Sequence, residues 1–242
     1  MPRYGTEKLY VDLKYQLKEL RIKMGRDKFL RFCREQHLLV PKTKRCFITT
    51  DSKHFYYKSP NRIKDLLPVH AEQVFVSDIT YIKLENGYAY LALVTDLYSK
   101  KIMGYKLDNN MKVGMVKEAL KMAMNNCIYN HKYVIHHSDR GMQYCCPDYS
   151  EFAESKGCIL STTEKYDPYE NAVAERINGI LKYEFGLKRI IPTLAIATKM
   201  VEDAVKLYNG KRRHRSLEMQ TPNQAYKEQV HKYATYRKKS TA

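Results

Sequence analysis

The sequence predicts an α/β protein with a small helical module ahead of its core. Apolar, β-branched runs recur between residues 73 and 162 and alternate with segments of helical spacing, which indicates strands interleaved with helices. An Asn86-Gly87 pair between two of these runs is typical of a β-hairpin turn. With 242 residues, 44% of them hydrophobic, the chain is long enough for one sizeable core and a small appendage.

Two short helices are predicted within residues 1–40. Thr6 is a candidate N-cap for a first helix, Gly25 marks a turn, and a second helix is expected over 27–36. Two helices around a glycine turn indicate a helix-turn-helix-like module. Residues 41–69 contain three prolines and many basic side chains, so they are predicted to form an extended linker.

The core is predicted to have the element order βββαβαβα. Strands are expected over 73–84, 88–96, 101–107, 133–139 and 158–162. Helices are expected over 113–125, 147–156 and 171–182. The polar segment 164–170 is expected to be a flexible loop before the last of these helices.

Three acidic residues are the candidates for chemistry. Asp78 lies within the first predicted strand, Asp139 ends the fourth, and Glu175 lies in the last helix, with sixty and thirty-five residues between them. Carboxylates from two strands and a helix can hold two Mg²⁺ ions, because hard divalent cations prefer oxygen ligands. Two such ions suit the chemistry of a phosphodiester. A single Asp at a strand end is more usually a turn or capping residue, so only the joint pattern indicates a site.

Distinct motifs surround these carboxylates and continue toward both ends of the chain. Around the carboxylates they are SDITYI at 77–82, HSDRGMQY at 137–144 and ENAVAER at 170–176. Farther out they are YGTEKL at 4–9, YNGKRRHRSL at 208–217 and TPNQAY at 221–226. On these motifs the chain resembles the OrfB-type transposases of the IS-three family of insertion sequences, which have a retroviral-integrase-like DDE catalytic core. The resemblance covers nearly the whole chain.

The resemblance implies a fold, a domain order and an activity. The fold is a ribonuclease-H-like integrase core, a mixed five-stranded sheet with flanking helices. The domain order is a helical DNA-binding-like module, a basic linker, the catalytic core and a basic C-terminal extension, over residues 1–40, 41–69, 70–187 and 188–242. The activity is that of a DDE transposase, a magnesium-dependent polynucleotidyl transferase that cleaves DNA strands and transfers the ends of an insertion sequence.

The resemblance also implies site residues. Asp78, Asp139 and Glu175 are then the catalytic residues and the ligands of two Mg²⁺ ions, with Mn²⁺ as a substitute. Lys182 lies seven residues beyond Glu175, on the same helix face, and is a candidate DNA contact near the scissile phosphate; a solvated helix lysine is the alternative. The other candidates for DNA binding are Arg140, Arg176, Arg212, Arg213 and His214.

The net charge of +17 is unevenly distributed. Residues 1–70 hold 17 Lys and Arg against 7 Asp and Glu, and residues 176–242 hold 15 against 5. Residues 71–175, which contain the three carboxylates, hold 11 against 14. A basic cradle around an acidic centre suits an enzyme that acts on nucleic acid. A generic solvated surface is the alternative for the charge, and an RNA-binding protein would share the charge without the acidic centre.

Some functional classes are disfavoured. The six cysteines have no CxxC spacing, which argues against a zinc site and against a secreted disulfide framework. No apolar run approaches the ~20 residues that a membrane span needs. We therefore expect a soluble, cytoplasmic protein, and the resemblance implies a bacterial one associated with the nucleoid.

The partners follow from the same resemblance. They are DNA, both as element ends and as target, further copies of the chain assembled on DNA, and an upstream first-frame product. Two alternatives to a transposase remain open. A plain ribonuclease-H-like nuclease would share the carboxylates without joining a 3′ end to target DNA, and a DNA-binding regulator or remnant of a two-frame transposase would bind without transposing.

Overall fold

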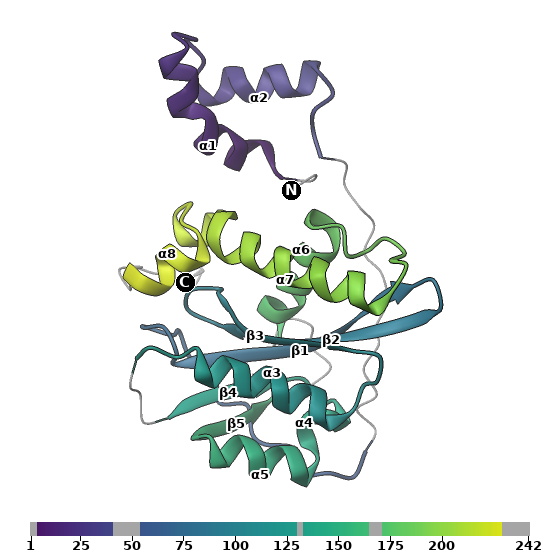
Figure 1. The fold of residues 1–242 in the computed structure, drawn as a ribbon. Coiled ribbons are helices and arrows are strands. Elements are labelled where there is room, and N and C mark those ends of the chain that lie inside the picture. Colours follow the sequence, from purple (N-terminus) through teal and green to yellow (C-terminus); the bar gives the residue numbers. More distant parts are fainter. Residues whose placement is uncertain (1–3, 41–53, 130–132, 165–170, 229–242) are drawn as a thin grey trace, which may run out of the picture.

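A five-stranded sheet forms the centre of the molecule in the computed structural model, which describes residues 4–40, 54–129, 133–164 and 171–228 (Figure 1). The strand order is β3-β2-β1-β4-β5. The strands are β1 Val74–Leu84, β2 Gly87–Asp96, β3 Ile102–Asp108, β4 Val134–Ser138 and β5 Cys158–Thr162. All five lie within two residues of their predicted positions, so the predicted strands are confirmed.

The sheet is mixed because its connections differ in length. β1, β2 and β3 are antiparallel neighbours, and the tight turn into β2 uses Gly87 at a φ of 108°, a conformation that a side chain disfavours. β4 pairs with β1 in parallel, and β5 pairs with β4 in parallel. A parallel neighbour requires a crossover, and helices supply it between β3 and β4 and between β4 and β5.

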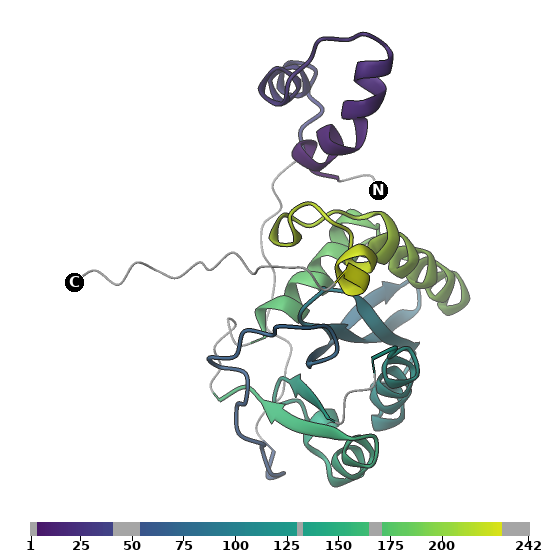
Figure 2. The same cartoon turned by 90° about the vertical axis from the view of Figure 1, so that its left-hand side faces the viewer.

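Helices cover both faces of the sheet (Figures 1 and 2). α3 Val113–Asn125 and α5 Pro147–Ser155 lie on one face, and α6 Ala172–Glu184 and α7 Leu194–Lys211 lie on the other. The period of two along β2 explains the division, because Ala92 and Val94 pack toward α3 whereas Leu91 and Leu93 pack toward α6 and α7. The short elements are α4 Met142–Cys145, the 3₁₀ turn η1 Arg215–Leu217 and α8 Pro222–Glu228.

The N-terminal module consists of α1 Thr6–Glu19 and α2 Arg26–Glu35, and α2 lies within one residue of its predicted range of 27–36. The Tyr10 and Phe29 rings join the two helices, with 5.6 Å between their centroids. The prediction that Thr6 caps α1 is wrong. Gly5 is the N-cap and makes no side-chain bond, so Thr6 is the first residue within the helix.

Part of the predicted linker lies against the edge of the sheet. The Thr162 hydroxyl donates to the Ser59 carbonyl at 2.6 Å, and the Arg62 backbone N–H donates to the Ser161 hydroxyl at 2.9 Å. Residues 54–69 are therefore tied to β5, the edge strand. Residues 41–53 of the linker and residues 165–170 of the expected loop lie outside the described residues.

The helices after residue 190 were not foreseen as elements. The buried residues of α7 recur at helical spacing and join the apolar cluster of α6 and β2; they are Ala197, Val201, Ala204, Val205 and Tyr208. This cluster spans residue 187, the predicted end of the catalytic core. Within the part of the chain that the structure describes, no helix combines the length and the apolar character needed to cross a membrane.

Candidate active site

The parallel pairing of β1 with β4 aligns two of the three candidate carboxylates. Ser77 of β1 is paired with Ser138 of β4, so Asp78 and Asp139 are the next residues along two adjacent parallel strands. Both are half-buried. Asp78 Oδ1 accepts a hydrogen bond from its neighbour Ile79 N at 2.9 Å, and Asp139 Oδ1 accepts one from Gly141 N at 3.0 Å. The sheet register therefore places the two residues that carry these carboxylates side by side.

Helix α6 brings the third carboxylate and is held to β1 by two asparagines. Asn171 Nδ2 donates to the Ser77 carbonyl at 3.1 Å, and Asn178 Nδ2 donates to Asp78 Oδ2 at 2.8 Å. Both asparagines are buried, whereas Glu175 between them is exposed. Since residues three and four apart share a helix face, the two amides fix the turn of α6 that carries Glu175.

The three carboxylates interact electrostatically. The pKa of Asp78 is raised to about 7, mainly by burial and also by the charges of Asp139 and Glu175. The hydrogen bonds from Asn178 and from Ile79 N act in the opposite direction. Like charges at close range disfavour ionisation, so Asp139 and Glu175 both lie near enough to Asp78 to oppose its charge.

The donor set suits a hard divalent cation, although it does not form a closed ligand shell. Within the described residues, no three His, Cys, Asp or Glu side chains stand close enough to form a ready-made metal site. Asn178 Oδ1 is buried without a hydrogen-bond partner beside the mutually repelling carboxylates. Oxygen ligands of this kind are what Mg²⁺ prefers, and a cation among them would relieve the repulsion.

Lys182 lies on the same side of α6 as the carboxylates. Its side chain is half-buried, and its Nζ atom is 4.3 Å from the centroid of the Tyr81 ring on β1. Burial lowers the pKa of Lys182, while the charge of Asp78 acts to raise it. Lys182 is therefore a cation held beside the acidic centre rather than a freely solvated side chain.

The other predicted DNA-binding residues near the carboxylates differ in their contacts. Arg140 Nε donates to the Thr163 carbonyl at 2.5 Å, and its guanidinium also donates to the Glu164 carbonyl. These bonds tie the loop after β4 to the end of β5. Arg176, the residue after Glu175, is exposed.

The basic tail motif is mostly engaged within the protein. Arg212, predicted to contact DNA, is only 2% exposed and donates to both carboxylate oxygens of Glu184 at 2.7 Å. His214 is also buried, and burial together with the Arg212 charge lowers its pKa to about 2. A DNA backbone cannot reach either side chain as the protein is folded. Arg213 is half-buried and pairs with Asp12 of α1 at 2.5 Å.

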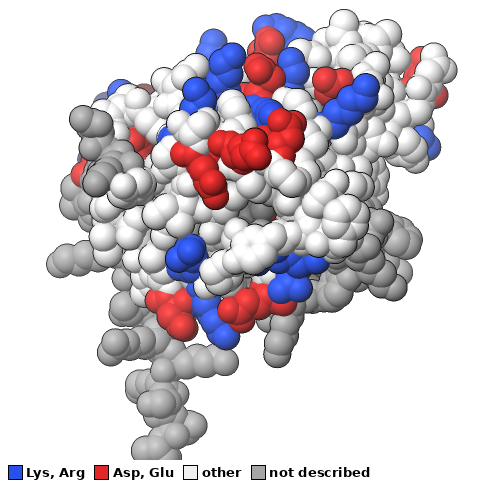
Figure 3. Space-filling view, turned by 90° about the horizontal axis from the view of Figure 1, so that it is seen from below, with Lys and Arg blue, Asp and Glu red and all other residues white. Residues whose placement is uncertain are grey.

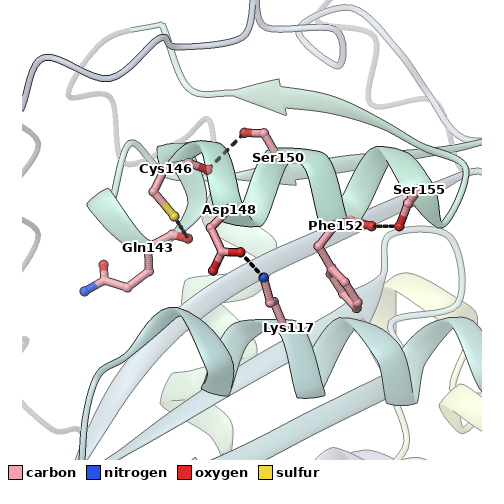
Figure 4. Close-up of polar contacts among 7 residues, drawn as sticks. All are labelled: Lys117, Gln143, Cys146, Asp148, Ser150, Phe152 and Ser155. Atoms are coloured by element: carbon pink, nitrogen blue, oxygen red, sulfur yellow. Dashed lines mark hydrogen bonds and ion pairs between the residues drawn. The ribbon is translucent and has the colours of Figure 1, made fainter.

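Polar contacts join α3 to the start of α5, in the segment that follows β4 (Figure 4). Lys117 of α3 forms an ion pair with Asp148 in the first turn of α5. The Ser150 hydroxyl donates to the Cys146 carbonyl at 3.3 Å, within the same segment. The ion pair joins α3 and α5, the two helices that cover this face.

The α3–α5 face does not form a continuous basic surface. Viewed from below, acidic side chains gather beside basic ones across this face (Figure 3). On α5 the exposed acidic residues are Asp148, Glu151 and Glu154. A polyanion is therefore not attracted uniformly to this side of the sheet. The candidate site residues Glu175 and Lys182 lie on α6, which covers the opposite face.

The asparagines of α6 were not singled out from the sequence. Their signal was present, because Asn171 and Asn178 are seven residues apart and frame Glu175 on one predicted helix. Buried polar side chains on the inner face of a helix require partners. Which partners they have depends on the tertiary contact with β1, which helical spacing does not specify.

The sheet, its flanking helices and the carboxylates beside two parallel strands define an integrase-type core. The integrase core domain model matches residues 68–168, and a second integrase core domain model matches residues 156–222. Among solved structures, the simian T-cell lymphotropic virus intasome is similar with a TM-score of 0.57 at 18% identity, over 73% of this chain and 60% of that one. The HTLV-2 integrase catalytic core in complex with magnesium gives 0.51 at 18%, over 65% and 97%. The ribonuclease-H-like fold class is thus confirmed.

Sequence relatives narrow the class to a family. A 31 kDa protein of insertion element IS600 from Shigella sonnei is 32% identical over 233 residues, which cover 96% of this chain and 84% of the relative. The IS904 transposase of Lactococcus lactis is 31% identical, over 70% of each chain. The InsF transposase of IS3A from Escherichia coli is 33% identical over 54% of this chain and 41% of its own. The chain belongs to the IS-three family of insertion-sequence transposases, and it is a DDE transposase of the polynucleotidyl transferase class, as the motifs predicted.

Proposed function

We propose that this transposase cleaves DNA at the ends of an insertion sequence and joins the freed 3′ end to target DNA, with Asp78, Asp139 and Glu175 as its catalytic residues. The observation that supports the proposal is that the charges of Asp139 and Glu175 act on Asp78. Two of these carboxylates come from adjacent strands and the third from α6. Water attack on the phosphodiester leaves a 3′ hydroxyl and a 5′ phosphate. Attack by that 3′ hydroxyl on a target phosphodiester then forms the new bond and releases a target 3′ oxygen.

The same three carboxylates hold divalent metal ions in this proposal. The chemistry of the oxygen donors supports Mg²⁺, and the similar HTLV-2 integrase core is described in complex with magnesium. We further propose two ions, with Mn²⁺ as a substitute. When bound, they supply Lewis-acid activation of the attacking oxygen and neutralise the leaving oxygen. Asn178 orients Asp78, and Glu175, whose charge acts on Asp78, completes the ligand set in this proposal.

An assay with labelled DNA separates this function from its alternatives. Purified protein is incubated with labelled element ends and target DNA in Mg²⁺, in Mn²⁺ and in a chelator. We expect nicked and joined products with either metal and none with the chelator. Cleavage without joining would favour a plain nuclease, and DNA binding without either product would favour a regulator or remnant. Products formed in the chelator would refute the metal assignment.

The DNA path in this proposal runs over α6 and the N-terminal module. Lys182, Arg176 and Arg140 contact the strand near the scissile phosphate. The exposed basic residues of α2, which are Arg26, Lys28, Arg31 and Arg34, contact the duplex farther away. Copies of the chain assemble on the element ends, an upstream first-frame product joins them, and this DNA binding keeps the protein on the bacterial nucleoid.

Replacing Lys182 with alanine should impair the reaction more than the fold. Loss of one phosphate contact should reduce the slope of log affinity against log salt by about 1 and weaken binding of element ends. The free energy of unfolding should fall by no more than about 1 kcal/mol, the value of a partly exposed cation–π contact. Strand transfer on pre-cleaved ends and thermal melting measure the two effects. Lys188→Ala, at an exposed lysine after α6, is the matched control, and equal activity in both variants would remove Lys182 from the DNA path.

Deleting residues 1–40 should lower DNA affinity and flatten its salt dependence. This segment holds 10 Lys and Arg against 5 Asp and Glu, and each phosphate contact contributes roughly −0.9 to the slope. The deletion stops at residue 40 because residues 54–69 are tied to β5. Fluorescence anisotropy at several salt concentrations measures the slope, and an unchanged slope would show that the N-terminal charges do not contact DNA.

A further inference from the structure

The motif at 208–217 forms a buried polar cluster rather than a basic surface. Arg212 is among the largest fully buried side chains among the described residues. Its guanidinium makes a two-bond pair with Glu184, and its third nitrogen lies 3.0 Å from His214 Nε2. The His214 and Tyr208 rings meet edge to face, with 5.2 Å between centroids. Burial with this many directed contacts indicates a fixed geometry.

This cluster is anchored to the sheet. Asn209 accepts a hydrogen bond from Ile102 N and donates one to the Ile102 carbonyl, both at 2.9 Å. The Tyr208 hydroxyl donates to the Lys100 carbonyl at 2.9 Å. The end of α7 is therefore bonded to the start of β3, and Arg212 extends from that fixed point.

The same cluster holds the helix that carries Glu175. Glu184 is the last residue of α6, so the Arg212 pair restrains the C-terminal end of that helix. The charge of Arg176, eight residues earlier on α6, also acts on His214 and Tyr208. The cluster thus lies along about two turns of α6, from the end of the helix to the residue beside Glu175.

We propose that Arg212 is a positioning residue for the reaction: by pairing with Glu184 it fixes the axis of α6 against the sheet, and so sets Glu175 and Lys182 relative to Asp78. This inference rests on the proposed function for its catalytic consequence. Asn171 and Asn178 hold the N-terminal half of α6 to β1, and Arg212 holds its other end. A helix bonded at one end only can pivot, which would misplace Glu175 and Lys182.

The pair can be tested without leaving a buried charge alone. Removing one partner of a buried pair strands the other, so single alanine variants are expected to misfold. Arg212→Met combined with Glu184→Leu replaces both partners by apolar side chains of similar length, which buried pairs often tolerate. Arg212→Lys keeps the charge but loses the two parallel bonds. Lys211→Ala, at an exposed residue next to Arg212, is the control.

The expected results separate positioning from stability. The double variant should melt within a few degrees of the parent, while kcat for strand transfer and Mn²⁺ affinity each fall at least tenfold. Arg212→Lys should show the same pattern more weakly. A double variant with parental melting temperature, parental kcat and parental Mn²⁺ affinity would overturn the proposal.

Hydrogen exchange provides a readout that does not depend on catalysis. In the double variant, amides of α6 should exchange at least tenfold faster than in the parent, while those of α3 and β1 stay unchanged. Uniformly faster exchange across the core would show that the pair only stabilises the fold, and unchanged exchange in α6 would also refute the proposal. If the parental protein forms no DNA product, the proposed function fails, but the exchange and Mn²⁺ measurements still decide the role of Arg212.

Discussion

Asp78→Asn should abolish DNA cleavage and joining while leaving DNA binding nearly unchanged, and Asp139→Asn and Glu175→Gln should do the same. Each change removes a charged oxygen ligand but keeps the size of the side chain. Loss of even an outer-sphere partner of a metal site typically costs 10- to 100-fold, so we expect a fall of at least roughly a hundredfold for each ligand. Gel assays of nicking and strand transfer measure the loss.

The controls for these variants are binding and folding. Anisotropy with labelled element ends should give a Kd within a few-fold of the parent, because the phosphate contacts come from basic side chains elsewhere. Circular dichroism should show an unchanged fold. A variant that cleaves and joins DNA at near-parental rate would remove that residue from the catalytic set, whatever the other two do.

The same Asp78→Asn change should stabilise the metal-free protein, because folding raises the pKa of Asp78 and so makes its charged form costly. The pKa of Asp78 is raised to about 7 in the folded protein from 3.8, so the folded state binds its proton more tightly than the unfolded state. The resulting penalty is complete above pH 7, shrinks as the pH falls, and is absent below 3.8. At pH 8 we expect the variant to gain of the order of 1–2 kcal/mol, and at pH 3.5 no gain. Urea unfolding at the two pH values tests this.

Sequence patterns report local structure but not contacts between distant segments, and this difference decides how much of the site could be predicted. Asp78 and Asp139 were assigned to strands because β-branched runs report local structure. That the two strands are parallel neighbours, with Ser77 opposite Ser138, is a long-range fact that local spacing does not contain. The three carboxylates could therefore be named from the sequence, whereas the interactions that hold them needed the fold.

Arg212 shows why the tail was harder to interpret. In a sequence, an arginine that binds phosphate looks the same as one that binds a buried carboxylate. The partner, Glu184, is 28 residues away on another helix, and nothing local links the two. The apolar residues of α7 did repeat at helical spacing, so the helix itself was predictable, while the direction of the Arg212 side chain was not.

Gly104→Ala should be among the most destabilising single changes in the sheet. Gly104 is buried in β3, where α3 crosses the strand closely. A β-carbon at this position would lie 2.0 Å from the Ala119 carbonyl oxygen and 2.6 Å from the Ala123 nitrogen, both backbone atoms of α3. Flexible side chains can move away from an added methyl group, but the backbone of a packed helix cannot do so without displacing the helix. Overpacking of a core usually costs about 1–3 kcal/mol, and we expect the upper end of that range or more here.

The matched control is Gly114→Ala, at the start of the same helix, where nothing lies within 4 Å of the added carbon. That change should be neutral or should stabilise by up to about 1 kcal/mol, because alanine favours a helix over glycine. Urea unfolding of both variants measures the difference. Equal stability of the two would mean that α3 and β3 are less closely packed than the structure describes. A large loss confined to Gly104→Ala would show that α3 approaches β3 as closely as the structure describes.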